Sequence, residues 1–372
     1  MHVAIYVDQL FYRQPGGIAT YLRGLLPRLA PLLSGEITLF HHGRGTASKG
    51  DGELPGKKVS LGLGRQAAAL LWHGPGFPRV ERWLGLVDLL HLPSLFFVPS
   101  RAPLVATVHD LAVLRYPRLF PARWRLLHAR ALGLVMKRAR LVLCDSASTE
   151  TDLLAAFPGC RRPETRVVPL GVEPPVDMGE EELASRLGRL GLSPGYLLFV
   201  GTLEPRKNLA RLAEAWRTLQ ERGLTGGREL VIAGPMGWLG ERERREILSL
   251  PGSRWLGYVS REDLEALYRG ACLFVYPSLY EGFGLPILEA MARGVPVVAS
   301  STPALREVAG DAALFPDPMS AEEIARALEE LLRDEGARRE LARAGLQRAA
   351  AFTWERTARW THESYLEAVG KV

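Results

Sequence analysis

The stretch YLLFVGTLEPRKNLARLAEAW, residues 196–216, contains one complete unit of the pattern that runs through this chain. Its apolar opening ends at Gly201, as expected for a buried strand of a parallel sheet. A short polar loop follows, and an amphipathic segment comes after it. The stretch therefore predicts a strand, a loop and a helix in succession, which is the building unit of α/β proteins.

The same alternation extends in both directions from this stretch. Further along the chain it predicts strands at 229–234, 253–259, 272–278 and 295–300, and helices near 320–334, 337–350 and 353–369. Before it, the pattern predicts strands at 3–8, 36–40, 86–92, 103–110, 140–145 and 165–171, with helices near 17–33, 121–138 and 147–157. We therefore predict an α/β protein with two doubly wound domains, in which ligands bind at the carboxyl ends of the strands.

The alternation is interrupted by VEPPVDMGEEELASRLGRLGLSPG, which combines paired prolines with a run of charges. We interpret it as the linker between the domains. Two domains also suit a chain of 372 residues, since one domain commonly takes about 150. The predicted bounds are 1–175 and 176–352, with a final helical segment at 353–372.

Composition excludes several classes of protein. Cys144, Cys160 and Cys272 show neither paired spacing nor nearby histidines, which argues against disulfides and a zinc site. The apolar run at the N-terminus is too short for a signal peptide, and no stretch approaches the roughly 20 apolar residues of a membrane span. These features favour a cytoplasmic protein.

Charge is unevenly distributed along the chain. Residues 1–175 hold 22 Lys+Arg against 12 Asp+Glu, whereas residues 176–372 hold 25 against 29. The segment from Arg115 to Arg140 is the most basic and also contains aromatic residues. It is either a solvated helix face or a peripheral contact with lipid phosphates at the inner face of a membrane, and nucleic acid is a weaker alternative.

The stretch YEGFGLPILEA, residues 280–290, predicts a phosphate site. Its glycines let a ligand approach the backbone closely, and its proline suits the first turn of a helix. The amides of Phe283, Gly284 and Leu285 would then face an anion at a helix N-terminus. Glu281 precedes these amides and Glu289 is expected in the first helical turn, where each carboxylate could accept sugar hydroxyls. The alternative is that both glutamates are solvated acids at the start of a helix, where the helix dipole favours negative charge.

A second candidate site lies in the opening stretch. Arg206 and Lys207 stand before a predicted helix, with Asn208 as the expected N-cap. The helix dipole disfavours cations at a helix start, so their placement suggests a bound diphosphate. Lys207 is one of only six lysines in the chain, and Asn208 is its single asparagine. A surface charge pair is the alternative.

Two weaker signals come from the first half of the chain. His109 follows a predicted strand, where doubly wound sheets contact ligands, although histidines at strand ends are often structural. Gly16 and Gly17 follow the first strand and open a helix, as an ordinary loop would also do. The glycines of VIAGPMGWLG lack the spacing of a dinucleotide fingerprint, which argues against a nicotinamide enzyme.

Taken together, GTLEPRKN, LGYVSREDLEALYRGA, PSLYEGFGLPILEAMARGVPVVAS and the N-terminal GGI and TVHDL resemble family 4 of the retaining glycosyltransferases, in its mannosyltransferase-like branch. The resemblance implies a GT-B fold of two facing Rossmann-like domains. It also implies a nucleotide diphosphate sugar as donor, GDP-mannose in this branch, and a glycan, lipid-linked or polysaccharide acceptor. No cofactor and no metal are implied.

The resemblance also implies a role for each matching residue. Arg206 and Lys207 would bind the donor diphosphate and stabilise its departure. Glu281 would hold the donor sugar, Glu289 the ribose, and the Phe283–Leu285 amides the distal phosphate. Backbone around Tyr258 and Val259 would meet the base, His109 would touch the sugar near the reacting carbon, and Gly16 and Gly17 would line the phosphate and acceptor side. The segment 353–372 would cross back onto the N-terminal domain.

Three alternatives remain at this stage. A glycoside hydrolase could use Glu281 and Glu289 as acid and nucleophile, but it needs no cation pair for a diphosphate. A nucleotide-sugar epimerase would need no acceptor, and a noncatalytic binding protein would turn over no donor.

Overall fold

The computed structural model describes residues 1–43, 54–158 and 163–370. They form two compact units. Unit 1 comprises Met1–Gly171 and Phe352–Val372, and unit 2 comprises Val172–Ala351. The sequence-based domain bounds stay predictions, because compactness alone does not show that a unit folds by itself. Cys160 lies outside the described residues, while Cys144 and Cys272 are free thiols.

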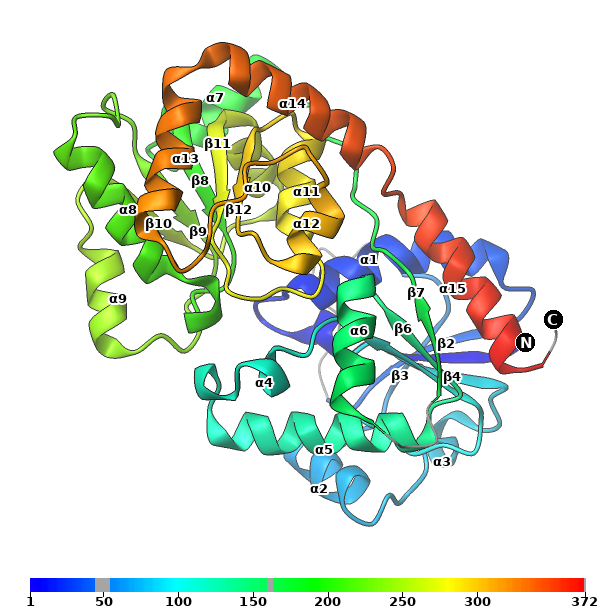
Figure 1. Ribbon diagram of the computed structural model, residues 1–372. Helices are drawn as coiled ribbons and strands as arrows, with labels where there is room; N and C mark the ends of the chain where they lie inside the picture. The colour runs from blue at the N-terminus through cyan, green and yellow to red at the C-terminus, as the bar shows by residue number, and fades with distance from the viewer. Residues whose placement is uncertain (44–53, 159–162, 371–372) are drawn as a thin grey trace. The chain divides into compact units, whose positions relative to one another are not determined.

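Unit 1 is built on a seven-stranded parallel sheet in the order β3-β2-β1-β4-β5-β6-β7 (Figure 1). Its strands are β1 Val3–Tyr6, β2 Ile37–His41, β3 Lys57–Ser60, β4 Leu89–Leu92, β5 Leu104–Val108, β6 Leu141–Cys144 and β7 Glu164–Val167. Its helices are α1 Gly17–Leu29, α2 Arg65–His73, α3 Glu81–Leu84, α4 Ala112–Arg115, α5 Ala122–Arg138, α6 Ala147–Ala156 and α15 Trp354–Ala368.

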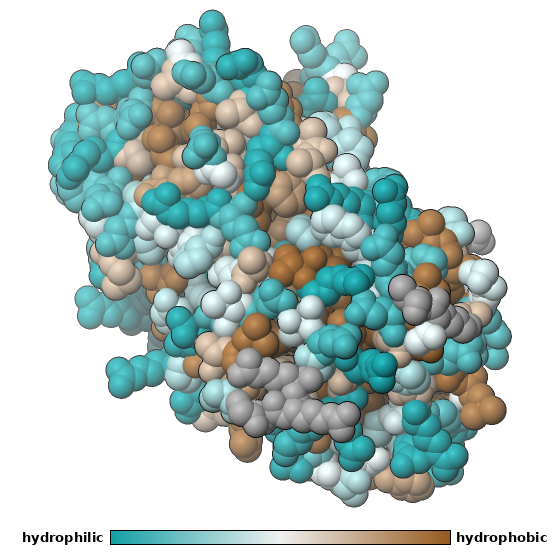
Figure 2. All heavy atoms as spheres, turned by 45° about the vertical axis from the view of Figure 1, so that its right-hand side comes forward, coloured by the Kyte–Doolittle hydropathy of each residue, from teal (hydrophilic) through white to brown (hydrophobic). Residues whose placement is uncertain are grey.

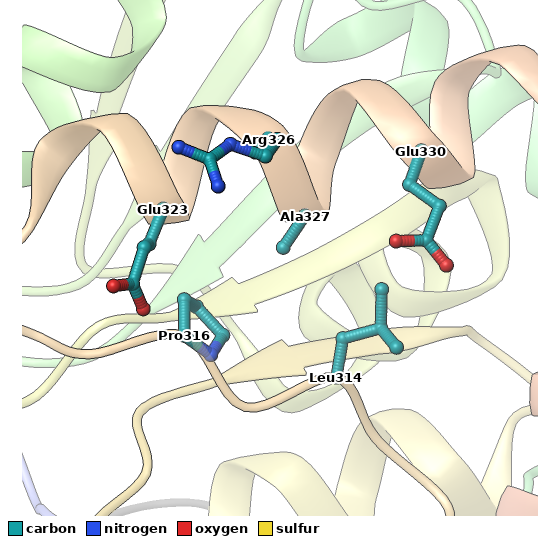
Figure 3. Close-up of a pocket in the computed structure, with 6 residues that line it drawn as sticks. All are labelled: Leu314, Pro316, Glu323, Arg326, Ala327 and Glu330. Atoms are coloured by element: carbon teal, nitrogen blue, oxygen red, sulfur yellow. The ribbon is translucent and has the colours of Figure 1, made fainter.

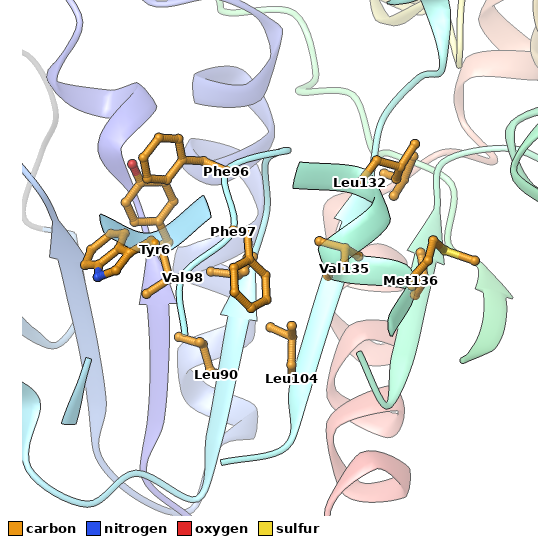
Figure 4. Close-up of a cluster of buried hydrophobic side chains, with 14 of the residues drawn as sticks. Tyr6, Leu90, Phe96, Phe97, Val98, Leu104, Leu132, Val135 and Met136 are labelled. Atoms are coloured by element: carbon orange, nitrogen blue, oxygen red, sulfur yellow. The ribbon is translucent and has the colours of Figure 1, made fainter. Parts of the chain in front are cut away.

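The two faces of this sheet are covered by different helices. On one face, strand side chains such as Tyr6 and Leu90 pack with Phe96 and with Val135 of α5 in a buried apolar cluster (Figure 4). On the other face, Tyr365 of α15 bonds to His91 of β4 through a 2.6 Å contact between Oη and Nδ1. Successive strand residues point to opposite faces, so a doubly wound sheet has two cores.

Unit 2 has a five-stranded parallel sheet in the order β10-β9-β8-β11-β12 (Figure 1). Its strands are β8 Tyr196–Val200, β9 Leu230–Ala233, β10 Ser253–Gly257, β11 Ala271–Tyr276 and β12 Val297–Ala299. Its helices are α7 Glu180–Arg189, α8 Leu209–Glu221, α9 Glu241–Leu248, α10 Arg261–Gly270, α11 Leu285–Ala292, α12 Pro303–Ala309, α13 Ala321–Arg333 and α14 Glu335–Ala349. The expected α/β class with two doubly wound parallel sheets is confirmed.

The linker expected from the sequence was wrong in part, and one strand was not expected. The segment read as a linker contains α7, whose buried Leu187 packs inside unit 2, so only part of it connects the units. Its charges lie on the exposed face of an amphipathic helix, and a run of charges in the sequence resembles a break in the strand and helix pattern. Strand β3 was also missed, because its exposed residues KKVS do not show the apolar pattern of a buried strand.

Candidate active site

The strand order of unit 2 reverses direction between β8 and β11, which makes this pair the switch point of the sheet. In doubly wound sheets the loops that leave the carboxyl ends of such a pair bind ligands. The loop after β8 contains a 3-10 turn, Pro205–Lys207, and the loop after β11 leads into α11. Both stretches singled out in the sequence therefore meet at this point.

Arg206, Lys207 and Glu281 form one buried ionic cluster. Arg206 Nη1 lies 2.7 Å from Glu281 Oε2, and Lys207 Nζ lies 2.7 Å from Glu281 Oε1. Each oxygen of this carboxylate therefore faces a different cation. Arg206 also pairs with Glu204 at 2.7 Å, a partner that the sequence did not indicate.

Charge and burial oppose each other in this cluster. Burial disfavours the ionised carboxyl, but the charges of Arg206 and Lys207 outweigh it and lower the pKa of Glu281 to about 2. Burial and the neighbouring Arg206 lower the pKa of Lys207, against the attraction of Glu281. Glu281 is therefore a fixed anion at neutral pH and has no proton to donate.

Further bonds hold the two loops together. The Leu279 amide donates to the Arg206 carbonyl at 2.9 Å, and Arg206 Nη1 donates to the Tyr280 carbonyl at 2.9 Å. Lys207 Nζ also donates to the hydroxyl of Tyr276 at 2.5 Å. Tyr276 ends β11 and was not singled out, because only the fold brings it to Lys207.

Asn208 occupies the cap position of α8, but its side chain does not cap the helix, contrary to expectation. Its amide nitrogen donates instead to the carbonyls of Pro277 and Pro318. The reason is its left-handed backbone, with φ of 59°, which departs from the extended geometry of a capping residue.

The N-terminus of α11 lies where the glycine pattern predicted it. Gly284 caps the helix with φ of 106°, and the helix begins at Leu285 with Pro286 in its first turn. The positive φ favours glycine there, and a Cβ atom on Gly284 would lie 2.4 Å from Leu305 Cδ2, so a larger residue would have to displace the Leu305 side chain. Phe283 and Leu285 are buried beside it.

Glu289 lies in the second turn of α11, not in the first turn as expected, because the helix begins only at Leu285. Its Oε2 accepts a 2.8 Å hydrogen bond from the hydroxyl of Tyr268 on α10. Burial raises the pKa of Glu289. The two glutamates therefore have different environments, one bound by two cations and the other by a hydroxyl.

Tyr258 and Val259 follow β10 directly, since this strand ends at Gly257 and α10 is capped by Ser260. The expected strand was two residues longer. Tyr258 is 43% exposed, and the expected contact of this backbone with a base stays a prediction.

The glycines of VIAGPMGWLG have a packing role. A Cβ atom on Gly234 would lie 2.0 Å from the carbonyl oxygen of Gly201, and one on Gly237 would lie 2.6 Å from that of Leu203. The loop after β9 thus packs directly against the loop that carries the cations.

In unit 1, His109 follows β5 and is held by two acceptors. Its Nδ1 lies 2.6 Å from Asp145 Oδ2, and its Nε2 lies 3.0 Å from the Pro93 carbonyl. Burial alone would lower the pKa of His109, but the Asp145 carboxylate outweighs it and raises this pKa. Because both ring nitrogens face oxygen acceptors, the geometry favours the doubly protonated ring. Asp145 follows β6, and the sequence gave no signal for it.

Gly16 caps α1 and Gly17 is its first residue. A Cβ atom on either glycine would meet nothing within 4 Å, so packing inside the protein does not require glycine at these positions. Both are exposed, and their expected contact with a phosphate or acceptor stays a prediction.

Metal ligands and surface pockets define other kinds of site. Within the described ranges no cluster of three or more His, Cys, Asp or Glu side chains could hold a metal ion. A pocket of about 250 Å³ lies between α13 and the segment that joins α12 to α13, lined by Leu314, Pro316, Glu323, Arg326, Ala327 and Glu330 (Figure 3). No predicted site residue lines it, and its mixed charges offer no cationic surface to a diphosphate.

The parallel sheets, with a buried cation cluster at the switch point of unit 2, place this chain in the class of doubly wound α/β proteins with a candidate ligand site at that edge. Comparison with known families makes the class more specific. Residues 15–175 match the model described as Glycosyltransferase Family 4, and residues 188–348 match the model described as Glycosyl transferases group 1. This chain belongs to the family 4 and group 1 glycosyltransferases, so it is a glycosyltransferase.

Individual relatives agree with this assignment. The O-antigen chain mannosyltransferase B of Escherichia coli is 32% identical over 94% of this chain and 95% of its own length. A D-inositol 3-phosphate glycosyltransferase of Salinispora arenicola is 34% identical over 85% of this chain and 75% of its own.

Solved structures show the fold. The sucrose-phosphate synthase of Thermosynechococcus elongatus superposes with a TM-score of 0.74 at 21% identity, covering 100% of both chains. HepE of Anabaena, solved with UDP and glucose, gives 0.76 at 19% identity, covering 98% of this chain and 99% of its own. The GT-B fold expected from the sequence is confirmed.

Proposed function

We propose that this glycosyltransferase transfers mannose, with retention of configuration, from GDP-mannose to a saccharide or lipid-linked acceptor of polysaccharide synthesis. The observation that carries the proposal is the buried cluster of Arg206, Lys207 and Glu281 at the switch point of unit 2. The similarity to the O-antigen mannosyltransferase supports mannose and a polysaccharide acceptor.

The cluster suits departure of a nucleoside diphosphate. Breaking the bond between the anomeric carbon and phosphate leaves negative charge on the diphosphate, and fixed cations stabilise that charge. In the free protein Glu281 is the counterion of both cations. A bound diphosphate would take over that role, and Glu281 would then be available to accept a hydroxyl of the donor sugar.

The neighbouring groups would complete the donor site. The N-terminus of α11 would hold the distal phosphate. Glu289, oriented by Tyr268, would accept the ribose hydroxyls. Because the cations supply the countercharge, transfer would proceed without a metal, and we expect a chelator to leave the rate unchanged.

The roles of unit 1 are proposed by family resemblance. His109 would contact the donor sugar near the reacting carbon through the part of its ring that Asp145 and Pro93 leave uncovered. Gly16 and Gly17 would line the phosphate and acceptor side. Deprotonation of the acceptor hydroxyl would be assisted by the leaving phosphate.

The test is a transfer assay on purified protein with a panel of nucleotide sugars. We expect turnover with GDP-mannose, and loss of it in Lys207→Met. Arg222→Met is the matched control, because Arg222 stands at the other end of α8 in an exposed pair with Glu322. Transfer by Lys207→Met at the rate of Arg222→Met would contradict the proposal, and preference for another nucleotide sugar would reassign the donor.

A peripheral contact with anionic lipid is a further part of the proposal. Leu126 of α5 and Leu70 of α2 are 74% and 76% exposed, and α5 also exposes Arg123 and Arg125. The two helices lie side by side (Figure 1), where Arg130 donates to the His73 carbonyl. Apolar side chains among arginines suit a lipid headgroup layer.

Figure 2 shows a mostly hydrophilic face with scattered apolar patches, as is usual for protein surfaces. No helix in the described part of the chain is long and apolar enough to cross a membrane.

Sedimentation with phosphatidylglycerol vesicles tests the proposed contact of α5 and α2 with anionic lipid. Arg123→Glu with Arg125→Glu should abolish binding, and equal binding to phosphatidylcholine vesicles would contradict it.

A further inference from the structure

Asn208 has a backbone conformation that asparagine rarely adopts. Its φ of 59° is the only positive φ at a non-glycine residue among those that the structure describes. The left-handed conformation costs a residue with a Cβ atom about 1 kcal/mol, and asparagine tolerates it better than most others. It turns the chain between Lys207 and the first residue of α8. Such a strained position persists only where other interactions hold it.

The Asn208 side chain supplies those interactions. Nδ2 donates to the Pro277 carbonyl at 3.0 Å and to the Pro318 carbonyl at 2.7 Å. Both partners are acceptors, so only the nitrogen side of the amide can satisfy them. Asn208 is 7% exposed, and the two carbonyls belong to segments far from it in sequence. One side chain thus ties three segments of unit 2 together.

These segments include both halves of the ionic cluster. Pro277 directly follows β11, which ends with Tyr276, and the same loop continues to Glu281. Lys207 precedes Asn208, and its Nζ reaches both Tyr276 and Glu281. A shift between the two loops would therefore change the position of the lysine ammonium relative to the carboxylate.

We propose that Asn208 is a positioning residue, whose side-chain amide fixes the loop of Lys207 on the loop of Glu281 in the geometry that the donor diphosphate requires. The proposal deepens the proposed function and rests on it for the identity of the ligand. Asn208 does not contact the diphosphate itself. Misplacement of a positioned group by about 1 Å can cost about 100-fold in rate.

Two variants separate the side chain from the backbone. Asn208→Gly keeps the left-handed turn without strain but loses both hydrogen bonds. Asn208→Asp keeps size and tolerance of this conformation but has no N–H to donate. We expect both to lower kcat for transfer at least tenfold, with a smaller change in KM for the donor.

The matched control is Trp216→Phe. Trp216 lies on the same helix, is buried, and donates to another proline carbonyl, that of Pro251 at 3.0 Å. We expect Trp216→Phe to be less stable than wild type but to keep the wild-type kcat per folded molecule. A wild-type kcat in Asn208→Gly would overturn the proposal, because the left-handed turn alone would then suffice. Equal losses of kcat in Trp216→Phe and Asn208→Gly would overturn it as well.

A second readout does not depend on the donor. If Asn208 positions Lys207, the Glu281 carboxyl should titrate at a higher pH in Asn208→Gly than in wild type, as followed by carbon NMR. An unchanged Glu281 titration would overturn the proposal. Calorimetry with GDP distinguishes failure of the proposed function from failure of the Asn208 proposal. A wild-type protein that does not bind GDP would refute the proposed function. The Glu281 titration would still test the role of Asn208 in that case.

Discussion

At the scale of the residue, the structure changes the meaning of Glu281. The sequence paired it with Glu289 as two acceptors for one donor. The structure gives it two cations as partners, and both lie more than 70 residues away along the chain. A buried carboxylate with two cations on it is stable only while it remains ionised.

Glu281→Gln should therefore destabilise unit 2. Removing one member of a buried ion pair leaves charge uncompensated, and we expect a loss of about 3 kcal/mol at neutral pH. Chemical denaturation measures it. Glu322→Gln, which breaks an exposed pair with Arg222, should cost less than about 1 kcal/mol. Equal costs for the two variants would contradict the assignment.

The same residue predicts an effect of pH. The pKa of Glu281 lies at about 2 in the folded protein, below its ordinary value of 4.5. A depressed pKa contributes stability that is present above 4.5 and is lost as the pH falls toward 2. Between these values the free energy of unfolding should fall less steeply in Glu281→Gln than in wild type. Parallel curves would contradict the prediction.

His109 offers a third prediction at this scale. Its raised pKa depends on Asp145, so Asp145→Asn should lower the pKa of His109. In wild type, the stability from this pair is complete below the ordinary histidine pKa of 6.5 and is lost as the pH rises through the raised value. Proton NMR of the ring measures both titrations. His73 is an internal reference, because burial and the neighbouring Arg130 and His128 lower its pKa to about 4. An unchanged pKa of His109 would refute its dependence on Asp145.

At the scale of the element, the sequence predicted buried strands well and exposed elements poorly. The stretch 196–201 became β8 because its apolar residues fill the interior of a parallel sheet. Strand β3 shows no such pattern, since an edge strand needs backbone partners more than apolar side chains. The charges of α7 hid a helix whose single fully buried residue, Leu187, anchors it.

The site was predictable to the same extent. Local patterns indicated Arg206, Lys207 and the glycine turn, because the loop and helix-start residues that mark them are only a few positions away in the sequence. Asp145, Tyr268 and Tyr276 gave no signal, since each meets its partner only after the strands pair. The role of Asn208 was misassigned for the same reason: its acceptors are carbonyls, which carry no sequence information.

Gly284→Ala tests the turn that begins α11. The change adds strain at a φ of 106° and a clash with Leu305, and we expect it to cost about 2 to 4 kcal/mol. Gly195→Ala is the control, because Gly195 has a φ of 105° but open space around its Cβ position. Thermal denaturation compares the two, and equal losses would show that the clash with Leu305 contributes nothing.

At the scale of the whole molecule, the end of the chain belongs to the unit that contains its beginning. Helix α15 packs on α1, where Gly24 allows close contact with the Trp354 ring. Thr357 of α15 also donates to the Pro169 carbonyl at 2.8 Å. Unit 1 is thus completed by residues that follow unit 2 in sequence.

Trp354→Ala should therefore weaken unit 1 and spare unit 2. Truncating a buried tryptophan costs about 3 to 5 kcal/mol. Hydrogen exchange followed by mass spectrometry should show faster exchange in residues 1–43, 54–158 and 163–171, while 172–351 keep wild-type rates. Faster exchange throughout unit 2 would contradict this division.

The central claim is that Arg206 and Lys207 hold the donor diphosphate. Isothermal titration calorimetry of GDP against wild type, Lys207→Met and Arg222→Met tests it most directly. We expect binding to wild type and to Arg222→Met with similar Kd, and a Kd at least tenfold weaker for Lys207→Met, since a charge-assisted bond to phosphate contributes about 1.5 to 3 kcal/mol. The same Kd for all three proteins would contradict the account.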